Sequence, residues 1–294
     1  MSARLPLPTW RSLMFVPVTA EKFVAKAHTR GADAIILDLE DSISPPEKET
    51  ARRALAAARA TVSQAGADVV VRINRPLELA VPDIAAAVMP GVSALMIPKV
   101  MGPEHIRLLS EVVAAREAQV GVPVGSTRFL ALVETPDALP HLHAIATADP
   151  RMASLSIGSE DMSTELGGMP TPDTLYVFAM LGVAASRAAG ILPMGAMGKF
   201  ADFSDLVGYR KGLKRGRALG FACTSCIHPL HVPIINEEYG VSDADADRAR
   251  RLIVAFEEAL AKGQGAAAFE GAMIDLPIVE RARRLLMRVR KPTA

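Results

Sequence analysis

Short apolar runs alternate with longer amphipathic stretches along the whole chain. Runs of about four to eight apolar, often β-branched residues are typical of buried strands, whereas apolar positions spaced three and four apart are typical of helices. The alternation therefore predicts parallel strands joined by helical crossovers. Eight strands are expected, over Ser12–Val18, Ala34–Leu39, Val69–Ile73, Ala94–Ile97, Phe129–Val133, Ser154–Ile157, Ile191–Met194 and Phe221–Ile227.

Helix-start signals lie between the expected strands. Pro45 and Pro103 open two helical segments, and Asp137 and Asp173 precede two others, where a negative charge favours a helix N-terminus. The seventh strand is the weakest of the eight because it is short and contains Pro193. Eight alternating strands and helices predict an α/β fold, a (β/α)8 TIM barrel.

The chain of 294 residues is long enough for one such barrel followed by a smaller region. We expect residues 1–240 to form the catalytic barrel and residues 241–294 to form a C-terminal helical extension or lid. Within that extension, one helix is predicted over Val241–Lys262, a flexible joint over Gly263–Gly265, and a terminal helix over Ala282–Val289.

Composition excludes several classes of function. The net charge of +1 offers no basic excess to attract nucleic acid. No apolar run approaches the length of about 18 residues that spans a membrane, and no secretion signal opens the chain, so we expect no membrane partner and a cytoplasmic location. The pair Cys223 and Cys226 has no second pair for a zinc site, and it is interpreted as two small residues of a buried strand.

Ionisable residues follow six of the eight expected strands, at the end of a barrel where active sites lie. Many such residues are solvated or cap a helix, which is an equally good explanation for Glu40, Asp137 and Glu160. Glu134 and Asp161 differ because each ends an apolar strand, where a carboxylate without a partner is costly. A hard divalent cation is such a partner, so this pair is expected to bind Mg²⁺.

Two basic residues also end strands. Arg72 suits a carboxylate or an enolate oxygen because its planar fork donates two parallel hydrogen bonds, and the alternative is a structural ion pair with Asp38 or Asp41. Lys99 is a candidate for a Schiff-base nucleophile. The carboxylate pair argues against that chemistry, so we interpret Lys99 as an electrostatic partner of the acids after the second strand.

At these residues the sequence resembles the HpcH/HpaI aldolase and citrate lyase β-subunit family, and within it the malyl-CoA, citramalyl-CoA and citryl-CoA lyases. The resemblance covers nearly the whole chain, and the order and spacing of its motifs are highly specific. The matching stretches are Arg11–Pro17, Gly31–Asp41, Val71–Asn74, Ile97–Lys99, Val133–Thr135, Gly158–Asp161, Ala218–Phe221, Ile227–Pro229 and Gly271–Pro277.

The resemblance implies a lyase that cleaves or forms a 3-hydroxy-carboxyacyl-CoA, giving an acyl-CoA and a 2-oxo acid. It implies Mg²⁺ held by Glu134 and Asp161, with Arg72 beside it as a catalytic and substrate-binding group. Substrate contacts are implied for Phe15, Lys26 and Glu134. It also implies a homo-oligomer, a trimer or hexamer, in which the tail of one subunit brings Asp275 to a neighbour's site as the acid-base group. Without the resemblance, Asp275 would be a loop residue that caps the terminal helix.

Three departures from the family pattern concern the substrate. Ala20 replaces a basic residue, Met194–Phe200 lacks an early aspartate, and Cys223–Thr224 replaces a Gly-Lys pair. Two alternatives therefore stay open beside the CoA-thioester lyase. One is a metal-dependent aldolase that acts on a free hydroxy-oxo-acid without CoA, and the other is a citrate lyase β-like subunit that works with an acyl-carrier partner.

Overall fold

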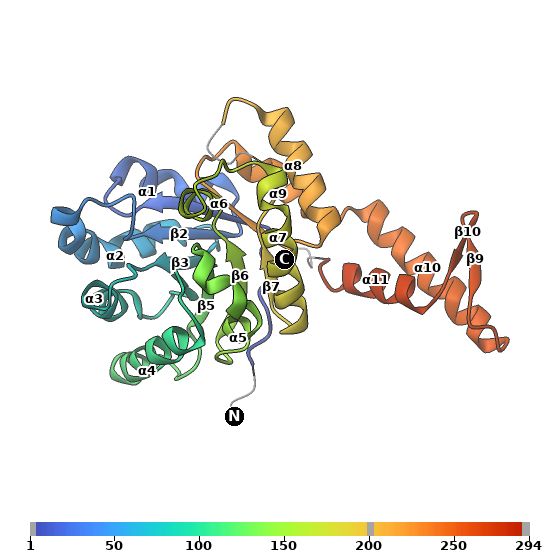
Figure 1. Cartoon of the computed structure of the whole chain (residues 1–294), viewed down its shortest axis with the longest axis horizontal. Coiled ribbons are helices and arrows are strands. Elements are labelled where there is room, and N and C mark those ends of the chain that lie inside the picture. Colours follow the sequence, from blue (N-terminus) through green and yellow to red (C-terminus); the bar gives the residue numbers. More distant parts are fainter. Residues whose placement is uncertain (1–3, 199–202, 290–294) are drawn as a thin grey trace. The chain divides into compact units, whose positions relative to one another are not determined.

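The computed structural model describes residues 4–198 and 203–289. Its main sheet has eight strands, and each lies where a strand is predicted. Helices follow the strands and cover their outer side, as Figure 1 shows. The strands are β1 (Ser12–Pro17), β2 (Ala34–Asp38), β3 (Asp68–Arg72), β4 (Ala94–Ile97), β5 (Arg128–Val133), β6 (Met152–Ile157), β7 (Leu192–Met194) and β8 (Thr224–Cys226).

The sheet is parallel throughout and runs in the order β7-β6-β5-β4-β3-β2-β1-β8. Its two ends meet, because Met194 forms a parallel bridge with Cys223 and the Gly195 N–H donates to the Cys223 carbonyl at 2.9 Å. The predicted TIM barrel is confirmed. Strand β7 has only three residues, and its Pro193 has no N–H to donate to the ladder.

The interior of the barrel is filled by apolar side chains from alternate positions of the strands, including Leu13, Ile36, Val70 and Leu130. Cys223 belongs to this core and Cys226 is also buried, and burial raises the pKa of the Cys226 thiol to about 12. A buried thiol with so high a pKa is a poor nucleophile and metal ligand. The interpretation of the two cysteines as small strand residues is confirmed.

The crossovers are mainly α-helical. The segments opened by Pro45 and Pro103 and those after Asp137 and Asp173 are helical, as predicted. The helices of the barrel are α1 (Glu21–Ala27), α2 (Lys48–Val62), α3 (Leu77–Ala87), α4 (Pro103–Val120), α5 (Leu142–Ala146), α6 (Ser159–Glu165), α7 (Pro172–Ala188), α8 (Leu206–Leu219) and α9 (His231–Glu238), with short 3₁₀ turns at His28–Arg30, Pro45–Glu47 and Pro136–His141.

Contacts divide the chain into two compact units, residues 1–238 and 239–294. The second contains α10 (Asp243–Ala261), a hairpin of β9 (Ala267–Phe269) and β10 (Ala272–Ile274), and α11 (Leu276–Leu286). The expected long helix is confirmed as α10. The expected terminal helix was wrong in its bounds, because α11 begins six residues before Ala282 and ends at Leu286.

The hairpin of the second unit was not predicted. Its strands have only three residues each, too few for an alternating pattern to be visible. The turn residues Glu270 and Gly271 have φ values of 49° and 81°, the backbone that a tight two-residue hairpin turn needs at both positions. Glutamate is not the residue usually found in the first of these positions, so the sequence lacked the common signal.

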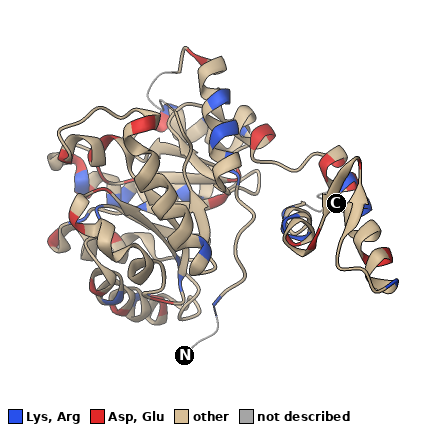
Figure 2. Ribbon diagram, turned by 45° about the vertical axis from the view of Figure 1, so that its right-hand side comes forward, with Lys and Arg blue, Asp and Glu red and all other residues tan. Residues whose placement is uncertain are grey.

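Charged residues of both signs are interspersed over the helices and loops, as Figure 2 shows, in keeping with the small net charge. Among the described residues, no helix has both the length and the apolar character needed to cross a membrane.

Candidate functional site

Three cavities open at the carboxyl ends of the strands, and the third, of about 490 Å³, is lined by Lys99, Glu134 and Asp161 among others. The first, which we call the carboxylate pocket, encloses about 230 Å³ and is lined by Glu134, Glu160 and Asp161 among others. The second, the α1 pocket, encloses about 550 Å³ beside α1. Phe15 and Arg72 line the first two cavities. The candidate residues Phe15, Arg72, Glu134 and Asp161 are therefore gathered around one pocket.

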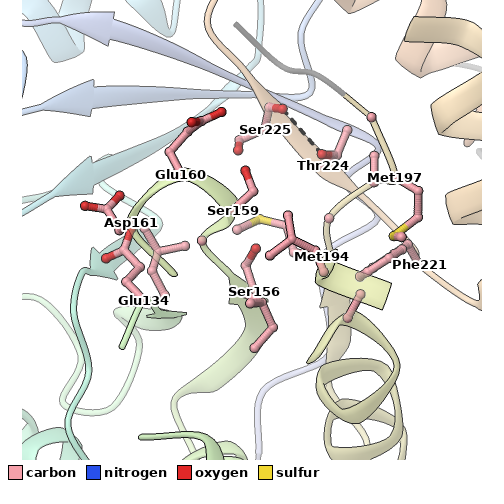
Figure 3. A pocket seen from close by; sticks show the side chains of 18 of the residues that line it. Glu134, Ser156, Ser159, Glu160, Asp161, Met194, Met197, Phe221, Thr224 and Ser225 are labelled. Atoms are coloured by element: carbon pink, nitrogen blue, oxygen red, sulfur yellow. Dashed lines mark hydrogen bonds between the residues drawn. The ribbon is translucent and has the colours of Figure 1, made fainter. Parts of the chain in front are cut away.

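Glu134 and Asp161 come from neighbouring strand ends. Glu134 directly follows β5, and Asp161 lies in the first turn of α6, just after β6. Figure 3 shows the two carboxylates close to each other at one side of the pocket. The Glu134 carboxylate accepts a hydrogen bond from the Lys99 backbone N–H at 2.7 Å.

Gly158 leaves the space that the Glu134 side chain occupies. A Cβ atom at Gly158 would lie 2.4 Å from Cγ of Glu134, closer than two carbon atoms can approach. Any other residue at position 158 would therefore push the Glu134 side chain out of its place.

The electrostatics of this pair are unfavourable without a cation. Burial raises the pKa of Glu134 to about 7, and the charge of nearby Asp161 acts in the same direction. Neither carboxylate forms an ion pair with a lysine or arginine in the described part of the chain. No group of three or more His, Cys, Asp or Glu side chains that fits a metal ion is present there either. Two carboxylates with open space beside them match Mg²⁺, which takes one or two protein carboxylates and completes its shell with water or substrate oxygens.

The other side of the barrel mouth is a closed network of charges around Arg72. The Arg72 guanidinium donates to both oxygens of Asp38 at 2.7 Å and lies 2.9 Å from an oxygen of Glu40. Its carbon Cζ lies 4.8 Å from the centre of the Phe15 ring. Burial alone would raise the pKa of Asp38, but the hydrogen bonds and charge of Arg72 outweigh it and the pKa is lowered. The structural ion pair considered above therefore exists.

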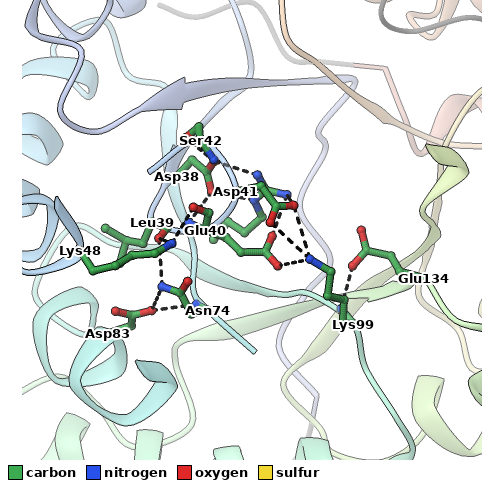
Figure 4. Close-up of polar contacts among 11 residues, drawn as sticks. Asp38, Leu39, Glu40, Asp41, Ser42, Lys48, Asn74, Asp83, Lys99 and Glu134 are labelled. Carbon is green, nitrogen blue, oxygen red and sulfur yellow. Dashed lines mark hydrogen bonds and ion pairs between the residues drawn. The ribbon is translucent and has the colours of Figure 1, made fainter. Parts of the chain in front are cut away.

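Lys99 joins this network to the carboxylate pair. Its Nζ lies 2.8 Å from Glu40 Oε1 and 3.4 Å from Asp41, as the dashed lines in Figure 4 indicate. Burial would lower the pKa of Lys99, but the bond to Glu40 raises it well above its usual value, which disfavours a neutral nucleophile. The interpretation of Lys99 as a partner of the strand-two acids is confirmed.

The backbone of Lys99 is unusual. Its φ is 47°, in the left-handed region that a residue with a side chain rarely adopts. This conformation places the Lys99 N–H against Glu134 while Nζ reaches Glu40.

A second layer of side chains holds the loop after β2. Lys48 Nζ donates to the carbonyls of Leu39 and Glu40, both at 2.7 Å, and the buried Asp83 accepts from the backbone and side chain of Asn74 at 2.7 Å. No sequence pattern singled out Lys48 or Asp83, because Lys48 begins α2 and Asp83 lies within α3, and neither follows directly after a strand.

The α1 pocket contains Lys26, together with Lys22, Arg30 and His228. Its floor is apolar, formed in part by Met14, Phe15 and Pro17. Ala20 precedes α1 and contributes no charge there. A long ligand with an apolar part and phosphate groups matches this combination of lining residues.

Asp275 lies in the second unit, at the N-cap position of α11, and is half-buried. This is the position that the alternative interpretation gave it, but its side chain makes no capping hydrogen bond. Of the departing segments, Met194–Gly198 and Cys223–Thr224 lie at the carboxylate pocket or beside it, whereas Lys199 and Phe200 lie outside the described residues. Sequence reasoning missed Ser156 and Ser225, whose hydroxyls also line this pocket.

A model of the HpcH/HpaI aldolase/citrate lyase family matches residues 11–229. The citrate lyase subunit beta of Leuconostoc mesenteroides subsp. cremoris is 33% identical over 283 residues, which cover 94% of this chain and 92% of the relative. A (3S)-malyl-CoA thioesterase of Cereibacter sphaeroides is 33% identical over 280 residues, covering 94% of this chain and 93% of the relative.

Solved structures agree with these relatives. The protein CitE of Mycobacterium tuberculosis, in complex with magnesium, acetoacetate and coenzyme A, superposes with a TM-score of 0.73 at 28% identity and covers 94% of this chain and 97% of its own. A citrate lyase of Burkholderia xenovorans superposes with a TM-score of 0.81 at 18% identity, covering 97% of this chain and 92% of its own, and at that identity it supports the fold alone.

Proposed function

The chain belongs to the HpcH/HpaI aldolase/citrate lyase family, which makes it a lyase, and we propose on this basis that it is a Mg²⁺-dependent carbon–carbon lyase of CoA thioesters. Its substrate would be a 3-hydroxy-carboxyacyl-CoA, of the malyl-CoA, citramalyl-CoA or citryl-CoA type, which it cleaves or forms. The products are an acyl-CoA and a 2-oxo acid. The observation that carries this proposal is the pair Glu134 and Asp161, which has no cationic partner and faces a pocket shared with Arg72.

We propose Glu134 and Asp161 as the protein ligands of the metal. When bound, Mg²⁺ would acidify the substrate hydroxyl and neutralise the carboxylate next to it. The raised pKa of Glu134 and its position at the side of the pocket support this assignment. The solved complex of the M. tuberculosis CitE with magnesium supports a magnesium ion in this family.

Arg72 is proposed to stabilise the negative charge that develops on the thioester oxygen as the carbon–carbon bond breaks. The hydrogen bonds to Asp38 fix the plane of the guanidinium before substrate arrives. A donor held in advance stabilises the transition state without reorganisation during the reaction. The side chain also lines both pockets, so it lies between the proposed sites of the 2-oxo acid and the thioester.

We place the CoA thioester in the α1 pocket. Phe15 would contact the acyl portion and Lys26 the phosphate groups, since the two residues line the same cavity. The M. tuberculosis structure with coenzyme A supports a CoA ligand in this family. Lys22 and Arg30, which line the pocket beside Lys26, are proposed to take over the charge that Ala20 does not supply.

Asp275 is proposed as the group that delivers or removes the proton at the α-carbon, within a homo-oligomer, a trimer or hexamer, in which residues 241–294 act as a lid on a neighbouring subunit. Its carboxylate is free of a capping bond and so is available for proton transfer. Gly263, Gly265 and Gly271 allow the segment before it to change direction.

Product analysis of the purified chain tests the proposal. Citramalyl-CoA with Mg²⁺ should give acetyl-CoA and pyruvate from the chain alone. A free hydroxy-oxo-acid cleaved without CoA would support the aldolase alternative instead. Activity only in the presence of an acyl-carrier protein would support the citrate lyase β-like alternative.

A further inference from the structure

The carboxylate pocket has two chemically different halves. Glu134, Glu160 and Asp161 lie on one side, and Met194, Met197 and Phe221 lie on the other, with Ser156 and Ser159 between them (Figure 3). Leu132, Ile157, Leu175 and Ala179 also line the cavity. A ligand held at the carboxylate end therefore extends toward apolar atoms.

The charged residues that line the pocket do not suit a ligand with several negative charges. Arg72 is the one basic side chain among the described residues that line the cavity, and Asp38 and Glu40 already engage it. A second carboxylate on the substrate, reaching toward Met194, would lie against apolar side chains, and the one cation of the described lining, Arg72, already faces Asp38 and Glu40. Burial of an unpaired charge is strongly unfavourable.

The apolar wall is built by the segments that depart from the family pattern. Met194 and Met197 lie in the segment without an early aspartate, and both are at most 3% exposed. Their positions are fixed by close approaches, because a Cβ at Gly195 would lie 2.8 Å from the Phe221 ring and one at Gly212 would lie 2.3 Å from the Met197 carbonyl. Tight packing therefore holds the apolar wall in its position.

The volume of the carboxylate pocket is larger than the smallest 2-oxo acids require. A cavity of about 150 Å³ lined by apolar side chains accommodates benzene, which has six carbon atoms. By the same density, about 230 Å³ has room for roughly nine non-hydrogen atoms. Pyruvate has six, so space is left for two or three further carbon atoms when Mg²⁺ and its waters occupy the adjoining cavity of about 490 Å³, which Glu134 and Asp161 also line.

We infer that the 2-oxo acid of this enzyme carries an uncharged alkyl chain about two to three carbons longer than that of pyruvate, and that the enzyme discriminates against a second carboxylate at that place. The inference rests on the proposed function, because the 2-oxo acid group is taken to bind at Glu134 and Asp161. It separates this chain from relatives that act on citrate-type substrates.

Binding measurements test this inference. Isothermal titration calorimetry on the Mg²⁺-loaded full chain would compare pyruvate, 2-oxopentanoate and oxaloacetate, the last two being similar in length and different in charge. We expect 2-oxopentanoate to bind roughly tenfold tighter than pyruvate, because two more buried methylene groups add about fourfold each. Oxaloacetate should bind at least tenfold weaker than 2-oxopentanoate.

Substitutions in α7 then locate the substituent. Ala179→Leu fills the apolar half and should weaken 2-oxopentanoate about tenfold while leaving pyruvate unchanged. Ala184→Leu, at an exposed position of the same helix, should alter neither. The half-buried Leu175 offers a gain-of-function variant, since Leu175→Arg adds the missing cation and should tighten oxaloacetate at least threefold.

The outcomes separate the inference from the proposed function. Tighter binding of oxaloacetate than of 2-oxopentanoate to the unsubstituted chain, with Mg²⁺-dependent binding intact, would overturn the inference alone. An equal effect of Ala179→Leu on pyruvate and 2-oxopentanoate would also overturn it. Absence of Mg²⁺-dependent binding for all three acids would overturn the proposed function itself.

Discussion

The two sides of the barrel mouth contain similar residues in opposite electrostatic situations. On the β2–β4 side, Glu40 is buried but lies within 2.9 Å of both Arg72 and Lys99. On the β5–β6 side, Glu134 is equally buried, and the charge that affects its pKa most is that of another carboxylate, Asp161. The pKa of each glutamate is raised by burial. Direct contacts with Arg72 and Lys99 oppose this at Glu40, whereas at Glu134 it is opposed only by the Lys99 backbone N–H and the more remote Lys99 charge.

The difference indicates what each side does. A network whose charges are already paired serves to hold groups in place, as it holds Arg72. A buried pair of like charges without counter-ions is costly in the folded protein unless a ligand compensates it. The β5–β6 side is therefore the side where a cation would bind, and the β2–β4 side is the frame that positions Arg72 next to it.

The largest contrast is expected from removing one carboxylate on each side. Glu134→Ala or Asp161→Ala should lower kcat by about a thousandfold or more. Either variant should leave the melting temperature of the metal-free protein unchanged or higher. Asp38→Ala should instead destabilise the protein strongly, by up to about 3–5 kcal/mol, because the buried Arg72 loses its bidentate partner and keeps only the contact with Glu40. Activity assays and thermal melts measure both. Full activity of either alanine variant, or of the wild type after exhaustive chelation, would rule out the metal site.

Arg72→Lys should have the next largest effect. The substitution keeps the charge but loses the bidentate contact with Asp38, so kcat should fall about a hundredfold with little change in melting temperature. Steady-state kinetics and a thermal melt of the same preparation give the comparison. Parallel losses of stability and activity would favour a purely structural role for the ion pair with Asp38.

The metal affinity should depend on pH through Glu134. Its pKa lies near 7 in the folded protein, above the ordinary value of 4.5, so protons compete with Mg²⁺ as the pH falls below about 7. Apparent affinity should drop about fivefold between pH 7 and pH 6 and stay nearly constant above pH 8.

The same pKa shift has the opposite consequence for the metal-free protein. A raised carboxyl pKa contributes stability at pH values below about 4.5 that is lost as the pH rises through about 7, and saturating Mg²⁺ should restore it. Melts at pH 6 and pH 8, with and without Mg²⁺, measure this. A metal affinity that is flat from pH 5 to pH 8 would be inconsistent with Glu134 as a ligand.

The smallest effects are expected at Lys99. Lys99→Gly keeps the backbone N–H that contacts Glu134 and removes the cost of a positive φ, so Mg²⁺ affinity should change less than about tenfold. Lys99→Ala should be less stable than the glycine variant by about 1 kcal/mol, since alanine retains the unfavourable backbone conformation. Borohydride in the presence of substrate should not label Lys99, and a covalent adduct there would show that a Schiff base forms after all.

Complementation between subunits tests the proposed role of Asp275. Asp275→Asn should bind Mg²⁺ and the thioester but lose turnover, because only proton transfer is removed. Mixed oligomers of Asp275→Asn and Arg72→Ala should regain part of the activity, since some sites receive both intact residues from different chains. Exchange of subunits is verified by a mass tag. No recovery in verified mixed oligomers would show that Asp275 does not act on a neighbour.

The barrel was predictable because each strand is an apolar run, even the short β7, and four of the crossovers carry a helix-start signal. The ion pairs at the barrel mouth were predictable only in part. Arg72 and Asp38 lie 34 residues apart, and no local sequence pattern indicates that they are in contact. The positive φ of Lys99 and the close approach of Gly158 to Glu134 are consequences of tertiary packing. The β9–β10 hairpin was missed because strands of three residues show no alternation.

Titration of Mg²⁺ into three proteins at pH 8 addresses the difference between the two sides of the mouth. The proteins are the wild type, Glu134→Gln and Glu40→Gln, so that each variant neutralises one buried glutamate of nearly equal exposure. Calorimetry should show binding by the wild type and by Glu40→Gln within about threefold, and no binding by Glu134→Gln. Unchanged Mg²⁺ affinity in Glu134→Gln, or its loss in Glu40→Gln alone, would place the cation on the other side of the mouth and contradict the assignment.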